Sequence, residues 1–259
     1  MKTTLVIPAT NGNFNYLRCI LSHYQDGSVK PDQVIISLSN AHLVSNIEDL
    51  EQRFRGVFED FKILKHNQTM VQGPNRDAAS MAADNEIIIS NDADDIPHPQ
   101  RIEVIKHCFE TLDILHLNHS YKTTEQTFDP IDLKEIKHLT PEQVFNHHFP
   151  KYNGEEYEGR RPQSQQYGFL SCYGAWMPWG GGEASTMAGA PAFHRDVFKT
   201  LRWRQQEELA WDYDFCLDVV FNLKKSTIID SKLMWYNLLP VHIRRENANP
   251  TELGVLYKN

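Results

Sequence analysis

The sequence predicts an α/β protein in which helices flank a mostly parallel central sheet. Short apolar runs, typical of strands buried on both faces, alternate with segments whose apolar residues recur at helical spacing. Strands that alternate with helices imply parallel pairing through right-handed crossovers. With 41% hydrophobic and 23% charged residues, the 259-residue chain has an ordinary globular composition and can bury a large core.

The expected strands of the first half are apolar runs with polar or Pro-containing ends. Pro8 ends the first run, and three consecutive isoleucines make the fourth run the clearest strand in the chain. Strands are expected at residues 4–7, 34–38, 61–64, 86–90 and 113–117.

The helices of the first half follow from apolar residues spaced three and four apart. The third of them consists of small residues, which can pack closely on a sheet. Helices are expected at residues 14–24, 43–58, 78–83 and 102–112.

The second half of the chain is less regular. Thr140 followed by Pro141 is typical of a helix start. Further helices are expected at residues 197–201 and 209–223, and a short strand begins at Ile228. We find no repeat or low-complexity linker, so a single domain over residues 1–259 is the simplest prediction.

Charge and composition exclude several classes of protein. The 26 Lys and Arg residues against 34 Asp and Glu give a net charge of −8, which argues against binding nucleic acid through a basic surface. No apolar stretch is long enough for a transmembrane segment, and Pro8 interrupts the apolar run that a signal peptide would need. The 4 cysteines are scattered without metal-site spacing, which favours reduced thiols and a cytoplasmic location.

An acidic cluster follows the clearest strand. Asp92, Asp94 and Asp95 come directly after residues 86–90, and ligands of open parallel sheets bind beyond the carboxyl ends of the strands. Carboxylates this close repel one another unless a cation or solvent neutralises them, and their oxygens suit Mg²⁺ or Mn²⁺. The alternative is an exposed acidic turn that caps the helix near Gln100.

Four blocks of this sequence follow one another in a characteristic order. The first is Leu-Val-Ile-Pro-Ala-Thr-Asn at residues 5–11, and the second is Gly-Pro-Asn-Arg-Asp-Ala-Ala at 73–79. The third is Asp-Ala-Asp-Asp at 92–95, with Pro99 and Arg101 beyond it. The fourth is Trp-Asp-Tyr-Asp-Phe at 211–215. In order and rough spacing these blocks resemble those of family 2 glycosyltransferases of the GT-A fold, in which the fourth block carries the catalytic base.

The resemblance implies a nucleotide-diphospho-sugar donor, expected to be a UDP-sugar, and a glycan or other hydroxyl acceptor. Asp212 would be the general base of an inverting single displacement. Asp94 would bind Mn²⁺ or Mg²⁺, and His242 could complete this metal site. The remaining donor-binding residues implied are Pro8, Thr10, Asn11, Asn40, Arg76, Asp92 and Arg244.

The same resemblance divides the domain into a nucleotide-sugar-binding half, residues 1–118, and an acceptor-binding and catalytic half, residues 119–259. Three positions depart from the family pattern. Thr10 stands where Tyr is usual, Asn40 follows a strand that usually ends in acidic residues, and Trp211 replaces a Glu. Asp212 also has a simpler interpretation as the N-cap of the following helix.

Two other functions compete with this prediction. A sugar-1-phosphate nucleotidyltransferase would need a Gly-rich, basic loop after the first strand, whereas residues 9–13 contain one Gly and the next basic residue is Arg18. A non-catalytic carbohydrate- or metal-binding module could use the same acidic turn. Gly180–Gly182 with Trp176 and Trp179 suggests a loop that contacts the acceptor, although a turn beside core tryptophans fits equally well.

Overall fold

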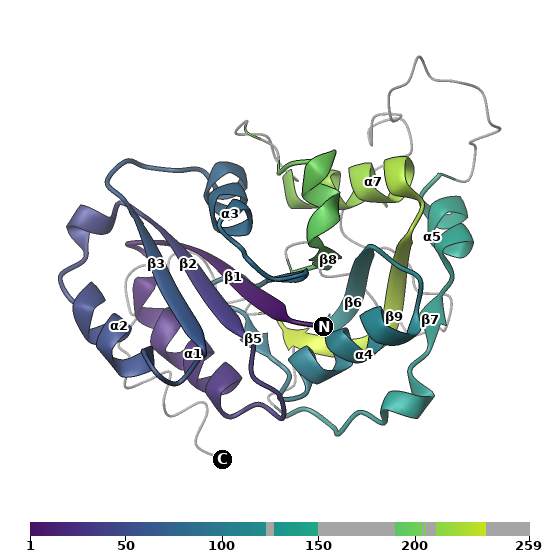
Figure 1. The fold of residues 1–259 in the computed structure, drawn as a ribbon, viewed down its shortest axis with the longest axis horizontal. Coiled ribbons are helices and arrows are strands. Elements are labelled where there is room, and N and C mark those ends of the chain that lie inside the picture. Colours follow the sequence, from purple (N-terminus) through teal and green to yellow (C-terminus); the bar gives the residue numbers. More distant parts are fainter. Residues whose placement is uncertain (123–126, 150–189, 204, 206–210, 237–259) are drawn as a thin grey trace.

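The computed structural model describes residues 1–122, 127–149, 190–203, 205 and 211–236 (Figure 1). These residues form a nine-stranded sheet in the order β3-β2-β1-β4-β8-β6-β9-β5, and β7 pairs with β9. The strands are β1 (Thr3–Thr10), β2 (Gln33–Ser39), β3 (Asp60–His66), β4 (Ile87–Ser90), β5 (Ile96–Pro97), β6 (His116–Lys122), β7 (His138–Leu139), β8 (Ala192–His194) and β9 (Ser226–Trp235).

Helices cover both faces of the sheet (Figure 1). One core unites α1, α2 and α4 with Leu5 and Ile7 of β1, and a second core on the other face unites α3 and α7 with Val6. This alternation shows that β1 is buried on both faces. The helices are α1 (Leu17–Gln25), α2 (Ile47–Phe54), α3 (Gln72–Met81), α4 (Arg101–Thr111), α5 (Pro141–His148) and α7 (Trp211–Leu223), with short 3₁₀ helices η1 (Phe14–Tyr16), η2 (Ala41–Leu43), η3 (Leu133–Glu135) and η5 (Arg195–Lys199).

The predicted α/β class is confirmed. Strands β3, β2, β1 and β4 are mutually parallel, and β6 and β9 form another parallel pair. Thr10 pairs with Ser39 at the ends of β1 and β2, so the carboxyl ends of these strands meet at one edge of the sheet. The antiparallel strand β8 lies between β4 and β6 and thereby joins the two halves of the chain into one sheet.

The expectation that Pro8 ends the first strand is wrong, because β1 continues to Thr10. The amide of Asn91 donates to Val6 O at 3.0 Å, so the backbone groups of Val6 and, two residues on, of Pro8 face the β4 side. The pairs between β1 and β4 stop at Val6. The missing N–H of Pro8 therefore breaks no ladder hydrogen bond, while pairing with β2 continues.

Other boundaries differ from the sequence predictions for local reasons. Asn40 adopts a left-handed conformation with φ 54°, which separates the turn η2 from α2 and shortens the helix expected at 43–58. Helix α3 begins earlier than expected, with Pro74 in its first turn. Residues 195–199 form the 3₁₀ helix η5. Strands β5, β7 and β8 have only two or three residues, too few for a periodic pattern.

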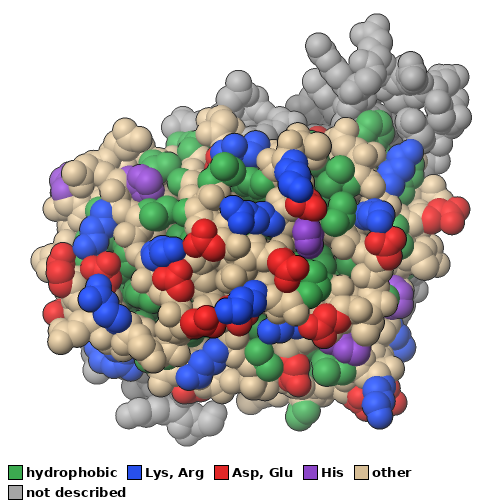
Figure 2. Space-filling model, viewed as in Figure 1, with side chains coloured by type: hydrophobic (Ala, Val, Ile, Leu, Met, Phe, Trp, Pro, Cys, Tyr) green, Lys and Arg blue, Asp and Glu red, His purple; other side chains and the backbone are tan. Residues whose placement is uncertain are grey.

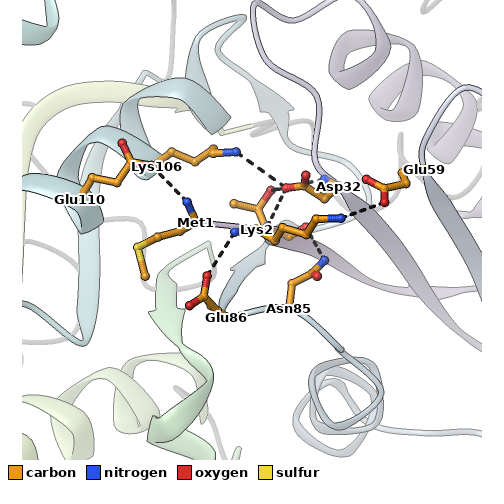
Figure 3. A network of polar contacts seen from close by, with 9 residues as sticks. Met1, Lys2, Asp32, Glu59, Asn85, Glu86, Lys106 and Glu110 are labelled. Atoms are coloured by element: carbon orange, nitrogen blue, oxygen red, sulfur yellow. Dashed lines mark hydrogen bonds and ion pairs between the residues drawn. The ribbon is translucent and has the colours of Figure 1, made fainter.

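Ion pairs cross the amino-terminal edge of the sheet (Figure 3). Lys2 Nζ lies 2.8 Å from Glu59, and the amino group of Met1 lies 3.2 Å from Glu110. These groups are partly or largely exposed, so each pair contributes little stability. On the face in Figure 2, basic and acidic side chains of the described residues are interspersed. None of the helices in the described ranges is long and apolar enough to cross a membrane.

Candidate active site

The acidic cluster lies in a turn at the carboxyl end of β4. We call residues 91–95 the acidic loop. Its first amide, from Asn91, donates to β1, and the Asp95 amide donates to Asp92 O at 3.3 Å, which closes the turn. Asp92 and Asp94 are half-buried and Asp95 is 1% exposed. The loop leads into β5 and the N-cap of α4 is Gln100, so the acidic residues do not cap that helix.

Arg76 of α3 binds the acidic loop directly. Its side chain is fully buried, and its Nη2 donates to Asp92 Oδ1. The guanidinium carbon also lies 5.1 Å from the centre of the Trp203 ring, a cation–π arrangement. The sequence predicted Arg76 and Asp92 as separate donor-binding residues, and the structure brings them into contact. The charge of Arg76 thereby balances one carboxylate of the acidic loop.

Trp203 connects α3 with α7 and was not singled out from the sequence. Its Nε1 donates to Ser80 Oγ of α3 at 3.1 Å. On the other side its ring stacks on Phe215 of α7, with centroids 3.8 Å apart and an interplanar angle of 26°. Its segment has no periodic pattern, so no local signal marks it. Trp203 therefore sets how α7, which contains Asp212, lies against the helix that contains Arg76.

A second ion pair fixes the same segment to α3. Arg202 Nε donates to Asp77 Oδ1 at 2.8 Å, and its Nη2 donates to the other carboxylate oxygen. This fork geometry fixes orientation as well as distance. Hydrogen bonding to Asp77 raises the pKa of Arg202 further above its ordinary value. Arg76 thus pairs with the acidic loop, and its neighbour Asp77 pairs with Arg202.

The loops after β1 and β2 meet at the carboxyl ends of these two strands. Asn40 Nδ2 donates to Asn11 Oδ1 at 3.4 Å, and Thr69 Oγ1 donates to Asn40 Oδ1 at 3.0 Å. Thr10 is engaged in its own turn, because its Oγ1 accepts from the Gly12 amide at 3.2 Å. The expected donor-binding residues Asn11 and Asn40 therefore lie together, whereas Pro8 is buried inside β1.

Asp212 is the second residue of α7, one position inside the helix rather than the residue before it. Helix α7 contacts α3, so Asp212 belongs to the same face of the sheet as Arg76. Its side-chain placement lies outside the described part of the structure. His242, Arg244 and the loop with Trp176 and Trp179 also fall outside the described residues.

The carboxylates of the acidic loop suit a metal ion that also binds a phosphate group. Within the described ranges, no three His, Cys, Asp or Glu side chains gather into a preformed metal site. Mg²⁺ typically keeps several waters and binds through one or two carboxylates plus substrate phosphates. The half-buried Asp94, in a loop whose Asp92 pairs with Arg76, offers such a carboxylate. The chemistry of these residues therefore suits Mg²⁺ or Mn²⁺ shared with a diphosphate.

No protein-family model matches the chain, and no curated protein matches its sequence. Solved structures do match. TarS 1–349 from S. aureus has a TM-score of 0.61 at 13% identity, covering 92% of this chain and 60% of the TarS chain. Its complex with UDP-GlcNAc has a TM-score of 0.60 at 11% identity, with coverages of 93% and 59%.

A second match is glucosyl-3-phosphoglycerate synthase from Mycobacterium tuberculosis in complex with Mn²⁺, UDP-glucose and phosphoglyceric acid. Its TM-score is 0.52 at 15% identity, covering 99% of this chain and 76% of the synthase. At these identities the likeness concerns the fold, which is the GT-A fold. The resemblance to glycosyltransferases of the GT-A fold that the sequence indicated is thus confirmed at the level of architecture. The chain spans 60% of the TarS fragment.

Proposed function

We propose that this chain is a metal-dependent glycosyltransferase that moves a sugar from a nucleotide-diphospho-sugar to an acceptor hydroxyl. The observation that carries the proposal is the acidic loop. It places half-buried Asp94, and Asp92 held by Arg76, at the carboxyl edge of the parallel strands of a GT-A fold. TarS with UDP-GlcNAc and the synthase with UDP-glucose and Mn²⁺ support this class of donor and metal.

In the proposed donor site, Asp94 holds the divalent metal and Asp92 contacts the nucleoside. The bound metal would stabilise the charge that grows on the leaving diphosphate. Asn11 and Asn40 supply amide groups at the neighbouring strand ends, where they can bind polar groups of the nucleotide. His242 and Arg244 remain proposed members of the site on the basis of the sequence.

On the acceptor side, Asp212 is the proposed base. An acceptor hydroxyl is a weak nucleophile and needs a base within hydrogen-bond reach as its oxygen attacks the anomeric carbon. Asp212 comes from a different segment than Asp94, so one carboxylate serves the metal and another serves the acceptor. Stacking of Phe215 on Trp203 anchors the first turns of α7.

Calorimetry with UDP and MnCl₂ tests the donor site. We expect UDP to bind the wild-type chain more tightly with Mn²⁺ than without it, and we expect Asp94→Asn to abolish this difference. The matched control is Asp196→Asn, which removes an exposed acid of η5 near the amino-terminal end of β4, whereas the acidic loop follows its carboxyl end. Unchanged Mn²⁺-assisted affinity in Asp94→Asn would refute the metal assignment.

Slow release of UDP from UDP-glucose or UDP-GlcNAc separates a transferase from its rivals. A transferase is expected to show Mn²⁺-dependent leakage of the sugar to water, whereas a binding module would bind the nucleotide and release none. A nucleotidyltransferase would instead release pyrophosphate from UTP and a sugar 1-phosphate. Either of these last two results would replace the proposed function.

A further inference from the structure

A buried polar network lies directly under the acidic loop. Tyr24 of α1, Asn91, the first residue of the acidic loop, and Arg101 of α4 form it, and we call these three residues the polar clamp. Each is at most 3% exposed. Burying a guanidinium, an amide and a phenol hydroxyl is costly unless their polar atoms are hydrogen-bonded. These three side chains therefore need hydrogen-bond partners within the protein.

Arg101 binds the end of β4 through both terminal nitrogens. Its Nη2 donates to Ser90 O and to Ala190 O, each at 2.8 Å. Its Nη1 donates to Asn91 Oδ1 at 2.8 Å and to the Tyr24 hydroxyl. The planar fork thus joins β4, its neighbouring segment and α1 at one point, which the single ammonium of a lysine cannot reproduce.

Asn91 connects Tyr24 and Arg101 to the backbone of the acidic loop. Its Oδ1 accepts from Arg101 and, at 2.5 Å, from the Tyr24 hydroxyl. Its Nδ2 donates to Asp92 O at 2.6 Å and to Asp95 O at 3.0 Å. Both donors and both acceptor positions of the amide are therefore used. One side chain spans the loop from its second residue to its last.

We propose that Tyr24, Asn91 and Arg101 are positioning residues that hold the acidic loop in the conformation that binds metal and nucleotide. This inference rests on the proposed function, because Asp92 and Asp94 are the residues being positioned. Both terminal nitrogens of Arg101 and every polar atom of the Asn91 side chain are hydrogen-bonded, and a buried network bonded in this way rigidifies the backbone that it contacts. Loss of one member lets the loop sample other conformations, and the affinity for the ligand falls with the fraction of competent loop.

Tyr24→Phe is the sharpest variant, because it removes one hydroxyl and keeps the ring in the core. We expect Mn²⁺-dependent UDP affinity to fall at least about three- to tenfold, because the hydroxyl makes two hydrogen bonds, one donated to Asn91 and one accepted from Arg101. The matched control is Thr4→Val, which removes a buried hydroxyl hydrogen bond to Gln33 at the amino-terminal end of β1. That control should lower the melting temperature and leave UDP affinity unchanged.

Two further variants separate the halves of the network. Asn91→Asp keeps the one oxygen that accepts from Tyr24 and Arg101 but loses both N–H donors to the loop carbonyls, and the new carboxylate can pair with Arg101. We expect it to reduce UDP affinity more than Tyr24→Phe does. Arg101→Lys tests whether the planar guanidinium is required. Wild-type UDP affinity in this variant would contradict the role given to the guanidinium.

Hydrogen exchange of the Asp95 amide supplies a readout that does not depend on the proposed function. This amide closes the turn to Asp92 O. It should exchange faster in Tyr24→Phe and Asn91→Asp than in Thr4→Val. If wild-type chain fails to bind UDP with Mn²⁺, the proposed donor site fails for that nucleotide, while the exchange rates still decide whether the clamp holds the loop. Wild-type exchange together with wild-type affinity in Tyr24→Phe would overturn the inference.

Discussion

Asp92 and Arg76 show how a site residue takes its properties from a partner. Arg76 is fully buried, and Asp92, with 25% of its side chain exposed, accepts its hydrogen bond. Removal of one partner from a buried ion pair leaves the other charge uncompensated in a poorly solvated environment. Asp92 therefore contributes to the stability of this region as well as to the proposed binding site.

Asp92→Asn should lower the free energy of unfolding by about 1–3 kcal/mol, because Arg76 loses its charged acceptor. Glu59→Gln is the comparison: it breaks the exposed pair with Lys2 and should cost at most about 1 kcal/mol. Urea unfolding of both variants checks the contrast. Equal losses would contradict the buried character of the Arg76–Asp92 pair.

Asp212→Asn should leave UDP and Mn²⁺ binding intact and reduce sugar release from the donor, because the amide cannot accept the proton of the attacking hydroxyl. A loss of about 10²-fold or more matches the usual contribution of a general base. Asp218→Asn, six residues later in α7, is the control. Near-normal turnover in Asp212→Asn would remove Asp212 from the catalytic role.

Residue types and a strand-end position were enough to predict Asp92 and Asp94 as individual site candidates, and the family resemblance added Arg76. Their pairing was not predictable, since Arg76 and Asp92 lie 16 residues apart in the chain, on a helix and after a strand. Which side chains of two such elements touch depends on how the elements pack. The sequence pattern contains the elements and not their packing.

At the scale of elements, the site depends on how α3 and α7 lie on the same face of the sheet. Trp203 lies between them, bonded to Ser80 of α3 and stacked on Phe215 of α7. It also lies under the guanidinium of Arg76. Trp203, which belongs to neither helix, therefore links α7, the helix of the proposed base, to α3, the helix of Arg76.

Trp203→Phe should destabilise the chain by about 1–3 kcal/mol, because a smaller ring leaves space between the helices and Ser80 loses its donor. Trp235→Phe, at the half-buried end of β9, is the matched control and should cost less. Thermal unfolding followed by circular dichroism measures both. A larger loss in Trp235→Phe would contradict the central place of Trp203.

Element identities were largely predictable, and short elements were not. The helix opened by Thr140 is confirmed with a complete capping box, since Thr140 and Gln143 bond each other's backbone amides. Strand β8 was not predicted, because a strand of three residues is too short to show a periodic pattern. Its antiparallel pairing with β4 and β6 depends on chain segments that are distant in sequence.

At the scale of the whole molecule, two histidines within the sheet make stability depend on pH. His116 and His119 of β6 are buried, and each pKa is lowered to about 3. Desolvation causes both shifts, and the positive charge of Arg101 adds to the shift at His119. His116 also lines a small cavity of about 10 Å³ together with Asn118 and Ser226.

The free energy of unfolding should fall as the pH drops from about 6.5 toward 3. In that window the unfolded chain binds protons at these histidines and the folded chain does not, at about 1.4 kcal/mol per pH unit for each group. His116→Gln removes one such group and should weaken the pH dependence between pH 7 and pH 5. Urea unfolding at these values checks this, with exposed His42→Gln as control. An unchanged slope in His116→Gln would contradict the assignment.

By itself, the sequence determined the α/β alternation, the parallel pairing of its first strands, and the acidic loop at their carboxyl edge. Apolar periodicity is local, and parallel strands necessarily end at a common edge. The tertiary structure alone decided the polar clamp, the Arg76–Asp92 pair, the Trp203 stack and the insertion of β8. Arg101 binds Asn91, Tyr24 and Ala190, which lie 10, 77 and 89 positions away from it in the chain. Such contacts form only when the elements pack.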